Sequence, residues 1–266
     1  NNDYDFGDVV MGNDHVISQE DGENIRQSEN AKVTNNDKRF GEEGETSIEL
    51  LDDLYDNIMR FNIPLSAQGG NYMNILAIGN SFSQDATRYL YDLAKAAGKD
   101  LTVVNLYIGG CPFSAHYRNM LSDKRAYCLE MNGESTGFAV SLKEALLNRD
   151  WDVITLQQAS PDCGFYESYQ PYLRDLTAFV RENCPGARLY FHQTWAYEID
   201  SDHGGFVNYN RDQQEMYRRI GDCTAMACRL IGADVLPSGP VVQYLRENAP
   251  EFDYKNGGLS LNRDGF

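Results

Sequence analysis

Four groups of polar or glycine residues in this chain each follow an apolar stretch typical of a buried β-strand. A serine hydroxyl can act as a nucleophile, and glycine N–H groups and side-chain amides can bind the oxyanion that forms when it attacks a carbonyl. These residue types therefore suggest acyl transfer. The four groups are Ser81, Gly109-Gly110, Gln157-Gln158-Ala159-Ser160 and His192-Gln193-Thr194-Trp195.

Ser81 ends a Gly-Asn-Ser turn at 79–81, between a predicted strand at 73–79 and a predicted helix at 84–98. This order would put its hydroxyl at the carboxyl end of a strand, beside the N–H groups of a helix N-terminus. The alternative is that Ser81 caps the helix, a role that serine fills well. Ser83 could cap the helix instead and leave Ser81 for chemistry.

The other groups have structural alternatives too. Gly109 and Gly110 form either an ordinary turn or an N–H donor to an oxyanion. Gln157 and Gln158 could simply end a strand, but two amides deep in an α/β protein need partners, which favours a site. His192 is more often a hydrogen-bonded structural group than a base.

His116 and His203 are also expected to be structural. No two histidines have a ligand spacing, so no metal site is expected, and no Gly-x-Gly-x-x-Gly or phosphate loop follows the first strand to hold a nucleotide or flavin. An aromatic cluster either lines a pocket or packs in the core. Its members are Phe165, Tyr166, Trp195 and Tyr197.

Strand and helix patterns alternate from Tyr72 onward, which predicts a parallel sheet with helices on both faces. An insertion at 125–134 contains Asn-Gly between extended flanks and predicts a hairpin at the sheet edge. Sites in such sheets lie at the carboxyl ends of the strands, where all four groups fall. The predicted strands are 73–79, 101–107, 151–156, 187–192 and 233–236, and the predicted helices are 84–98, 141–148, 169–183 and 208–231.

The first 70 residues differ from the rest in composition. Residues 1–47 are rich in Asn, Asp, Glu, Gly and Gln, which predicts flexibility. A short helix is predicted at 48–61 and a linker at 62–70. We therefore divide the chain into an acidic segment, 1–70, and a domain, 71–266.

Charge and composition exclude some classes of protein. The net charge of −17 argues against a nucleic-acid partner and disfavours an anionic membrane surface. No apolar run approaches the roughly 18–20 residues of a membrane span. None of the six cysteines forms a C-x-x-C pair, so a zinc ribbon or redox motif is not expected.

From Met73 to Phe266 the chain resembles the SGNH (GDSL-type) hydrolase superfamily, in particular a bacterial branch known only as a domain of unknown function. The turn at 79–81 looks like the opening Gly-Asp-Ser block, with Asn in the middle, and Gly109-Gly110 looks like the second block. Leu156-Gln157-Gln158 stands where the third block has Gly-x-Asn, and 264–266 looks like the start of a final Asp-x-x-His block.

The resemblance implies a three-layer α/β/α sandwich with a parallel five-stranded, flavodoxin-like sheet, and ester hydrolysis through an acyl-enzyme without cofactor or metal. Ser81 would be the nucleophile, and Asp264 would orient a histidine expected just after Phe266. The oxyanion would be held by the N–H groups of Ser81 and Gly110 and by the amide of Gln157 or Gln158. Residues expected near the pocket are Asn80, Ser160, His192 and Trp195.

The expected function is that of a carbohydrate O-acetylesterase or deacetylase acting on a small-molecule or carbohydrate ester, which favours an exported protein. The chain that stops at Phe266 is expected to be inactive and a longer one active; equal rates would point to His116 or His192 as the base. One alternative is a non-catalytic carbohydrate-binding or scaffolding module on a degenerate fold. A flavodoxin-like binder ranks last.

Overall fold

The computed structural model describes residues 10–12, 15–17 and 72–248. The chain divides into two units, Asn1–Ile63 and Pro64–Phe266. Within the first unit, the strands β1 (Val10–Gly12) and β2 (His15–Ile17) pair in antiparallel fashion, in a stretch predicted to be flexible. The predicted helix at 48–61, the predicted linker at 62–70 and the catalytic candidate Asp264 all lie outside the described residues.

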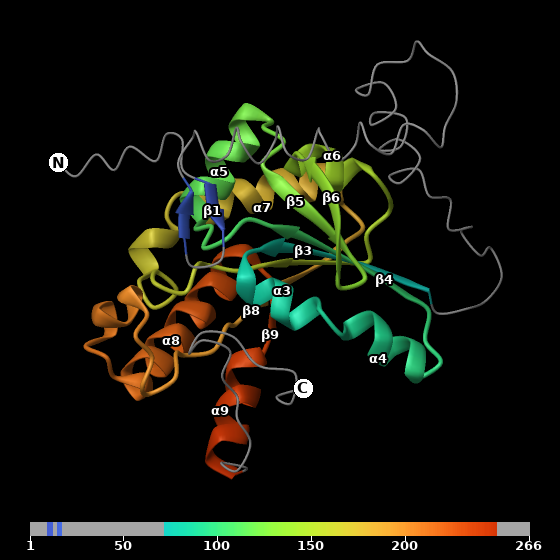
Figure 1. Ribbon diagram of the computed structural model, residues 1–266. Helices are drawn as coiled ribbons and strands as arrows, with labels where there is room; N and C mark the ends of the chain where they lie inside the picture. Colours follow the sequence, from blue (N-terminus) through green and yellow to red (C-terminus); the bar gives the residue numbers. More distant parts are fainter. Residues whose placement is uncertain (1–9, 13–14, 18–71, 249–266) are drawn as a thin grey trace, which may run out of the picture. The chain divides into compact units, whose positions relative to one another are not determined.

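A seven-stranded sheet forms the centre of the second unit, in the order β6-β5-β4-β3-β7-β8-β9 (Figure 1). Neighbours from β4 to β9 pair in parallel, so the predicted parallel α/β class is confirmed. Order reverses around β3, between β4 and β7, which makes the ends of these three strands the expected place for a site. The five parallel strands are β3 (Met73–Gly79), β4 (Leu101–Tyr107), β7 (Val153–Leu156), β8 (Arg188–His192) and β9 (Asp234–Leu236).

The predicted hairpin consists of β5 (Tyr127–Met131) and β6 (Glu134–Val140). Asn132 and Gly133 form its turn with φ values of 54° and 87°, the left-handed backbone that an Asn-Gly pair favours. β5 also pairs antiparallel with β4, so the hairpin joins the sheet. The seven strands are therefore the five predicted parallel strands and the two strands of the predicted hairpin.

Helices cover both faces of the sheet. Figure 1 shows α5 (Phe113–Ser122), α6 (Leu142–Leu147) and α7 (Tyr172–Asn183) on one side, and α3 (Ser81–Thr87), α4 (Leu90–Ala96) and α9 (Ser238–Asn248) on the other. The remaining helix, α8 (Gln213–Ile231), contacts α7, and the 3₁₀ helices η2 (Tyr166–Tyr169) and η3 (Gly204–Tyr209) lie in the connections. The three-layer α/β/α arrangement is thus confirmed.

The helix predicted at 84–98 is in fact two helices. Thr87 Oγ1 donates to the carbonyl of Ser83 at 2.8 Å, a back-bond that competes with regular helix geometry. The hairpin turn also packs closely against the break, since a Cβ on Gly133 would lie 2.1 Å from the Arg88 carbonyl oxygen. Two further helices, α5 and α9, were not predicted.

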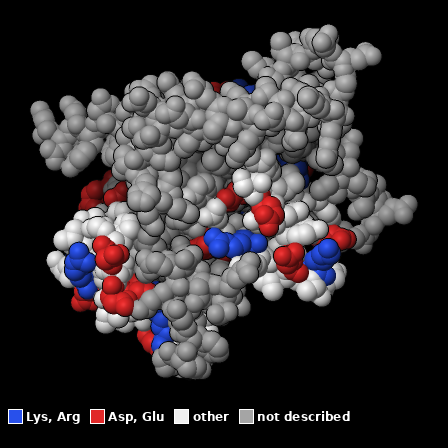
Figure 2. Space-filling view, in the orientation of Figure 1, with Lys and Arg blue, Asp and Glu red and all other residues white. Residues whose placement is uncertain are grey.

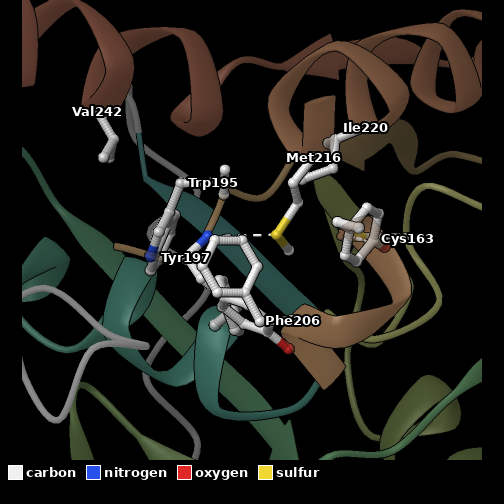
Figure 3. Close-up of a cluster of buried hydrophobic side chains, with 10 residues drawn as sticks. Cys163, Trp195, Tyr197, Phe206, Met216, Ile220 and Val242 are labelled. Carbon is white, nitrogen blue, oxygen red and sulfur yellow. Dashed lines mark hydrogen bonds between the residues drawn. The ribbon is translucent and has the colours of Figure 1, made fainter. Parts of the chain in front are cut away.

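An aromatic core contains residues of α3, η3, α8 and α9 and of the segments that follow β7 and β8. Figure 3 shows Trp195, Tyr197 and Phe206 packed together, with the Tyr197 N–H donating to Met216 Sδ at 3.4 Å. Among the described residues, none of the helices combines the length and apolar composition of a membrane span. On the described part of the face in Figure 2, basic and acidic side chains lie intermixed.

Candidate active site

Ser81 is the first residue of α3 and directly follows the turn that ends β3. Asn80 caps the helix, because its Oδ1 accepts the N–H of Phe82 at 3.1 Å. The Ser83 hydroxyl lies within hydrogen-bonding distance of the Asn80 carbonyl, at 2.8 Å, and of Asn105 Oδ1, at 2.7 Å. Neither serine is therefore the cap. Ser81 is half-buried, and its hydroxyl makes no hydrogen bond to any described residue, which leaves the hydroxyl available at the carboxyl end of the strand.

Gly79 is required because the end of β3, the start of α3 and the segment after β7 approach one another closely next to Ser81. A Cβ at this position would lie 2.6 Å from Ser83 Oγ and 2.9 Å from Cδ of Gln157. Real Cβ atoms do not approach other atoms so closely. The absence of a side chain therefore lets the amide that follows β7 reach the turn that carries Ser81.

The loop after β4 lies next to this turn. Strand pairing places Gly79 opposite Tyr107, so β3 and β4 end side by side. Gly110 has φ of 60°, which glycine adopts without strain, and a Cβ there would meet nothing within 4 Å. Asn80 Nδ2 donates to the carbonyl of Cys111 at 3.3 Å, which ties this loop to the Ser81 turn.

The two glutamines after β7 have different roles. Gln157 Nε2 donates to Asn80 Oδ1 at 2.6 Å, and one of its two amide N–H groups has no partner among the described residues. Gln158 Nε2 instead donates to the backbone oxygen and the hydroxyl of Ser168, while its Oε1 accepts the N–H of Phe113 at 2.9 Å. Gln157 thus belongs to the Ser81 turn, and Gln158 fastens the start of α5 to η2.

His192 lies at the end of β8 and is 2 % exposed. Its Nδ1 is 2.8 Å from Gln157 Oε1 and its Nε2 is 2.9 Å from Ser238 Oγ. Burial lowers its pKa to about 4, so the imidazole is neutral at pH 7. Both ring nitrogens are bonded to other groups, and neither is bonded to Ser81.

His116, on α5, is not hydrogen-bonded to Ser81 either. Its Nδ1 is 2.9 Å from the hydroxyl of Tyr127, and the two rings stack at 5.6 Å. Burial lowers its pKa to about 4. No histidine or carboxylate within 72–248 hydrogen-bonds to the Ser81 hydroxyl.

The remaining pocket candidates lie in the core. The Ser160 hydroxyl accepts a hydrogen bond from Tyr197 at 2.7 Å. Trp195 is 1 % exposed and packs on Phe82 with ring centroids 4.6 Å apart. Trp195 and Tyr197 belong to the buried cluster in Figure 3. Their contacts are those of core packing, which was the alternative to a pocket wall.

A second buried polar group supports α3 and was not found from the sequence. Asn105 Nδ2 donates to Glu130 Oε2 at 2.7 Å, Gln84 Nε2 donates to Glu130 Oε1, and Asn105 Oδ1 lies beside the Ser83 hydroxyl. The signal was an asparagine within a buried and mostly apolar strand. Its partner could not be found, because Glu130 reaches it only through the antiparallel pairing of β4 with β5.

Within the described residues, no group of three or more His, Cys, Asp or Glu side chains is placed to hold a metal ion. The residues predicted at the four strand ends thus fall into two sets, those connected to the Ser81 turn and those that are not. The Ser81 turn, the Gly110 loop, Gln157 and His192 are joined by hydrogen bonds, whereas Gln158, Ser160 and Trp195 have structural contacts elsewhere.

Comparison with known proteins identifies the family and the fold of this chain. Residues 74–266 match the domain of unknown function DUF4886. A crystal structure of a DUF4886 family protein from Bacteroides uniformis ATCC 8492 is 36% identical, with a TM-score of 0.69, over 72% of this chain and 76% of that one. A protein of Slackia heliotrinireducens assigned to the SGNH hydrolases is 20% identical, with a TM-score of 0.50, over 72% of this chain and 91% of that one.

No curated protein is significantly similar to the chain. The family match covers well over half of it, and the second structure has the same fold although its sequence has diverged. The chain therefore belongs to the DUF4886 family, and its fold is that of the SGNH hydrolase superfamily.

Proposed function

We propose that the protein is a serine ester hydrolase in which Ser81 attacks the ester carbonyl and forms an acyl-enzyme. The observation that carries this proposal is the Ser81 hydroxyl itself. It stands at the first position of a helix, is half-buried and has no hydrogen-bond partner among the described residues, while Asn80 and Ser83 in the same turn are held by hydrogen bonds. A nucleophile needs this combination of a fixed surrounding and an uncommitted hydroxyl.

The oxyanion would be bound by three donors. These are the N–H groups of Ser81 and Gly110 and the N–H of Gln157 that is not donated to Asn80. Gln158 is not included, since its amide is already bonded to Ser168. Loss of one such donor typically costs roughly 3–4 kcal/mol of transition-state stabilisation.

The general base would come from the Asp-x-x-His block that the resemblance implies, with Asp264 orienting the histidine. His192 supports this choice indirectly, because it is buried and both of its ring nitrogens are bonded to groups other than Ser81. His116 is also buried, with Nδ1 bonded to Tyr127 and Nε2 without a partner among the described residues. Activity should therefore require a protein that contains this histidine, which is called the extended protein below.

For the substrate, we propose a small acyl ester, in particular an acetylated carbohydrate. The side chains fixed around Ser81 are polar amides, Asn80 and Gln157, and the Gly110 loop is open on its side-chain face. Such surroundings suit a short acyl group and a hydroxyl-rich alcohol. Faster hydrolysis of octanoyl than of acetyl esters would overturn this preference.

The test compares the extended wild-type protein with Ser81→Ala, using acetyl ester hydrolysis and labelling by a fluorophosphonate. Ser81→Ala should lose labelling and lower kcat by about 10⁴-fold or more. Ser122→Ala, on the exposed last turn of α5, is the matched control and should keep wild-type rates. Absence of labelling and hydrolysis in the extended wild type would refute the proposal and favour the carbohydrate-binding module.

A further inference from the structure

Four buried or partly buried side chains form a continuous chain of hydrogen bonds across the carboxyl end of the sheet. Each comes from a different element: the turn before α3, the ends of β7 and β8, and the start of α9. The successive distances are 2.6, 2.8 and 2.9 Å. This polar relay consists of Asn80, Gln157, His192 and Ser238.

Backbone groups at one end fix the direction of every hydrogen bond in the polar relay. The Phe82 N–H can only donate and the Cys111 carbonyl can only accept, so Asn80 must present its oxygen to the first and its nitrogen to the second. Asn80 Oδ1 can then only accept from Gln157, which turns the amide nitrogen of Gln157 towards it.

The same reasoning continues to the other end. Gln157 Oε1 faces His192 and must accept, so the imidazole carries its proton on Nδ1. Nε2 is then an acceptor and receives the hydroxyl hydrogen of Ser238. This assignment is that of the neutral imidazole, which burial favours by lowering the pKa of His192 to about 4.

Asn80 connects the two parts of the catalytic arrangement. Its oxygen holds the N–H of Phe82, next to Ser81, and its nitrogen holds the carbonyl of Cys111, next to Gly110. A rotation of the Asn80 amide would break both contacts at once. The position of that amide is therefore what sets the Gly110 loop relative to the nucleophile.

We propose that the polar relay, through the carbonyl of Cys111, positions the loop that carries Gly110 against Ser81, with His192 as a neutral positioning residue that is protonated on Nδ1. The inference rests on the ester-hydrolase function proposed above. It assigns His192 a role other than the general base, and it makes the start of α9 part of the support of the site.

The first test is the protonation state of the ring in protein labelled with ¹⁵N-histidine. At pH 7, His192 should show a protonated Nδ1 and an unprotonated Nε2, and Ser238→Ala should shift the Nε2 resonance. The same variant should shift the backbone amide of Gly110, which His192, Gln157 and Asn80 connect to Ser238. A His192 ring protonated on Nε2, or a Gly110 amide that does not respond, would overturn the proposal.

The second test is kinetic and uses two replacements in the extended protein. His192→Asn keeps an N–H near the position of Nδ1 and should retain kcat within about tenfold. His192→Leu removes it and should lower kcat about 100-fold with little change in KM, because the donor loop is misplaced. Equally slow His192→Asn and His192→Leu enzymes would contradict the relay. His203→Asn, outside the relay, is the control and should behave as wild type.

The two proposals can fail separately. A wild-type protein that hydrolyses no ester refutes the hydrolase, and the ring tautomer and the Gly110 shift then still decide whether the polar relay holds that loop. Ester hydrolysis combined with a ring protonated on Nε2 refutes the relay alone.

Discussion

Replacement of Gly79 by alanine tests the close packing of this residue against Ser83 and Gln157, next to the proposed nucleophile. The new Cβ would lie 2.6 Å from Ser83 Oγ, which is about 0.8 Å closer than the 3.4 Å at which ordinary contact begins. Ser83 could turn away only by breaking its contacts with Asn80 and Asn105, which are worth about 1 kcal/mol each. If it stays, overpacking costs typically 1–3 kcal/mol.

Both routes give a loss of about 2 kcal/mol in the free energy of unfolding of the sheet domain, or roughly 4–8 °C in Tm. The measurement is urea unfolding followed by circular dichroism. The variant should also react with a fluorophosphonate about 100-fold more slowly in the extended protein, because Ser81 moves with the turn.

The matched control is Gly186→Ala, where a Cβ meets nothing within 4 Å. This variant should stay within about 0.5 kcal/mol of wild type. A Gly79→Ala protein with wild-type stability and labelling would show that the turn yields easily, and the argument from close packing would be wrong.

Two further predictions concern charge. Arg246 on α9 pairs with Glu198 at 2.6 Å, with side chains only 10% and 12% exposed, so Arg246→Met should cost about 3 kcal/mol in urea unfolding. Arg188→Met, which removes an exposed pair, should cost at most about 1 kcal/mol, and equal losses would contradict this reasoning. Burial lowers the pKa of His116 and His192 from 6.5 to about 4, so the unfolded chain binds more protons between these values. The free energy of unfolding should therefore be highest above pH 6.5 and fall by up to about 3 kcal/mol for each histidine as the pH drops to 4; unfolding curves that do not change over this range would refute it.

Local patterns predicted much of the sheet. The runs at 73–79 and 101–107 form strands with those bounds, and the Asn-Gly pair forms the hairpin turn. These local patterns predict the structure correctly because parallel strands buried on both faces are continuously apolar, and because few residue pairs adopt left-handed turns.

The two helices that were missed lack a clear local signal. α9 begins Ser-Gly-Pro, residues that weaken a helical prediction. Gly239 is nevertheless required there, since a Cβ would lie 2.3 Å from the Thr194 carbonyl oxygen. A contact with a residue 45 positions away in the sequence thus explains a glycine that, seen locally, argues against the helix.

The sequence by itself determined the α/β class, the strand ends where the site would form, and Ser81 as the candidate nucleophile. Only the tertiary structure decided that Asn80 is the cap, that Gln157 rather than Gln158 faces the turn, and that His192 is bonded away from Ser81. The physical reason is that residue type and spacing place a side chain at the end of a strand, whereas its hydrogen-bond partners come from strands and helices distant in the sequence.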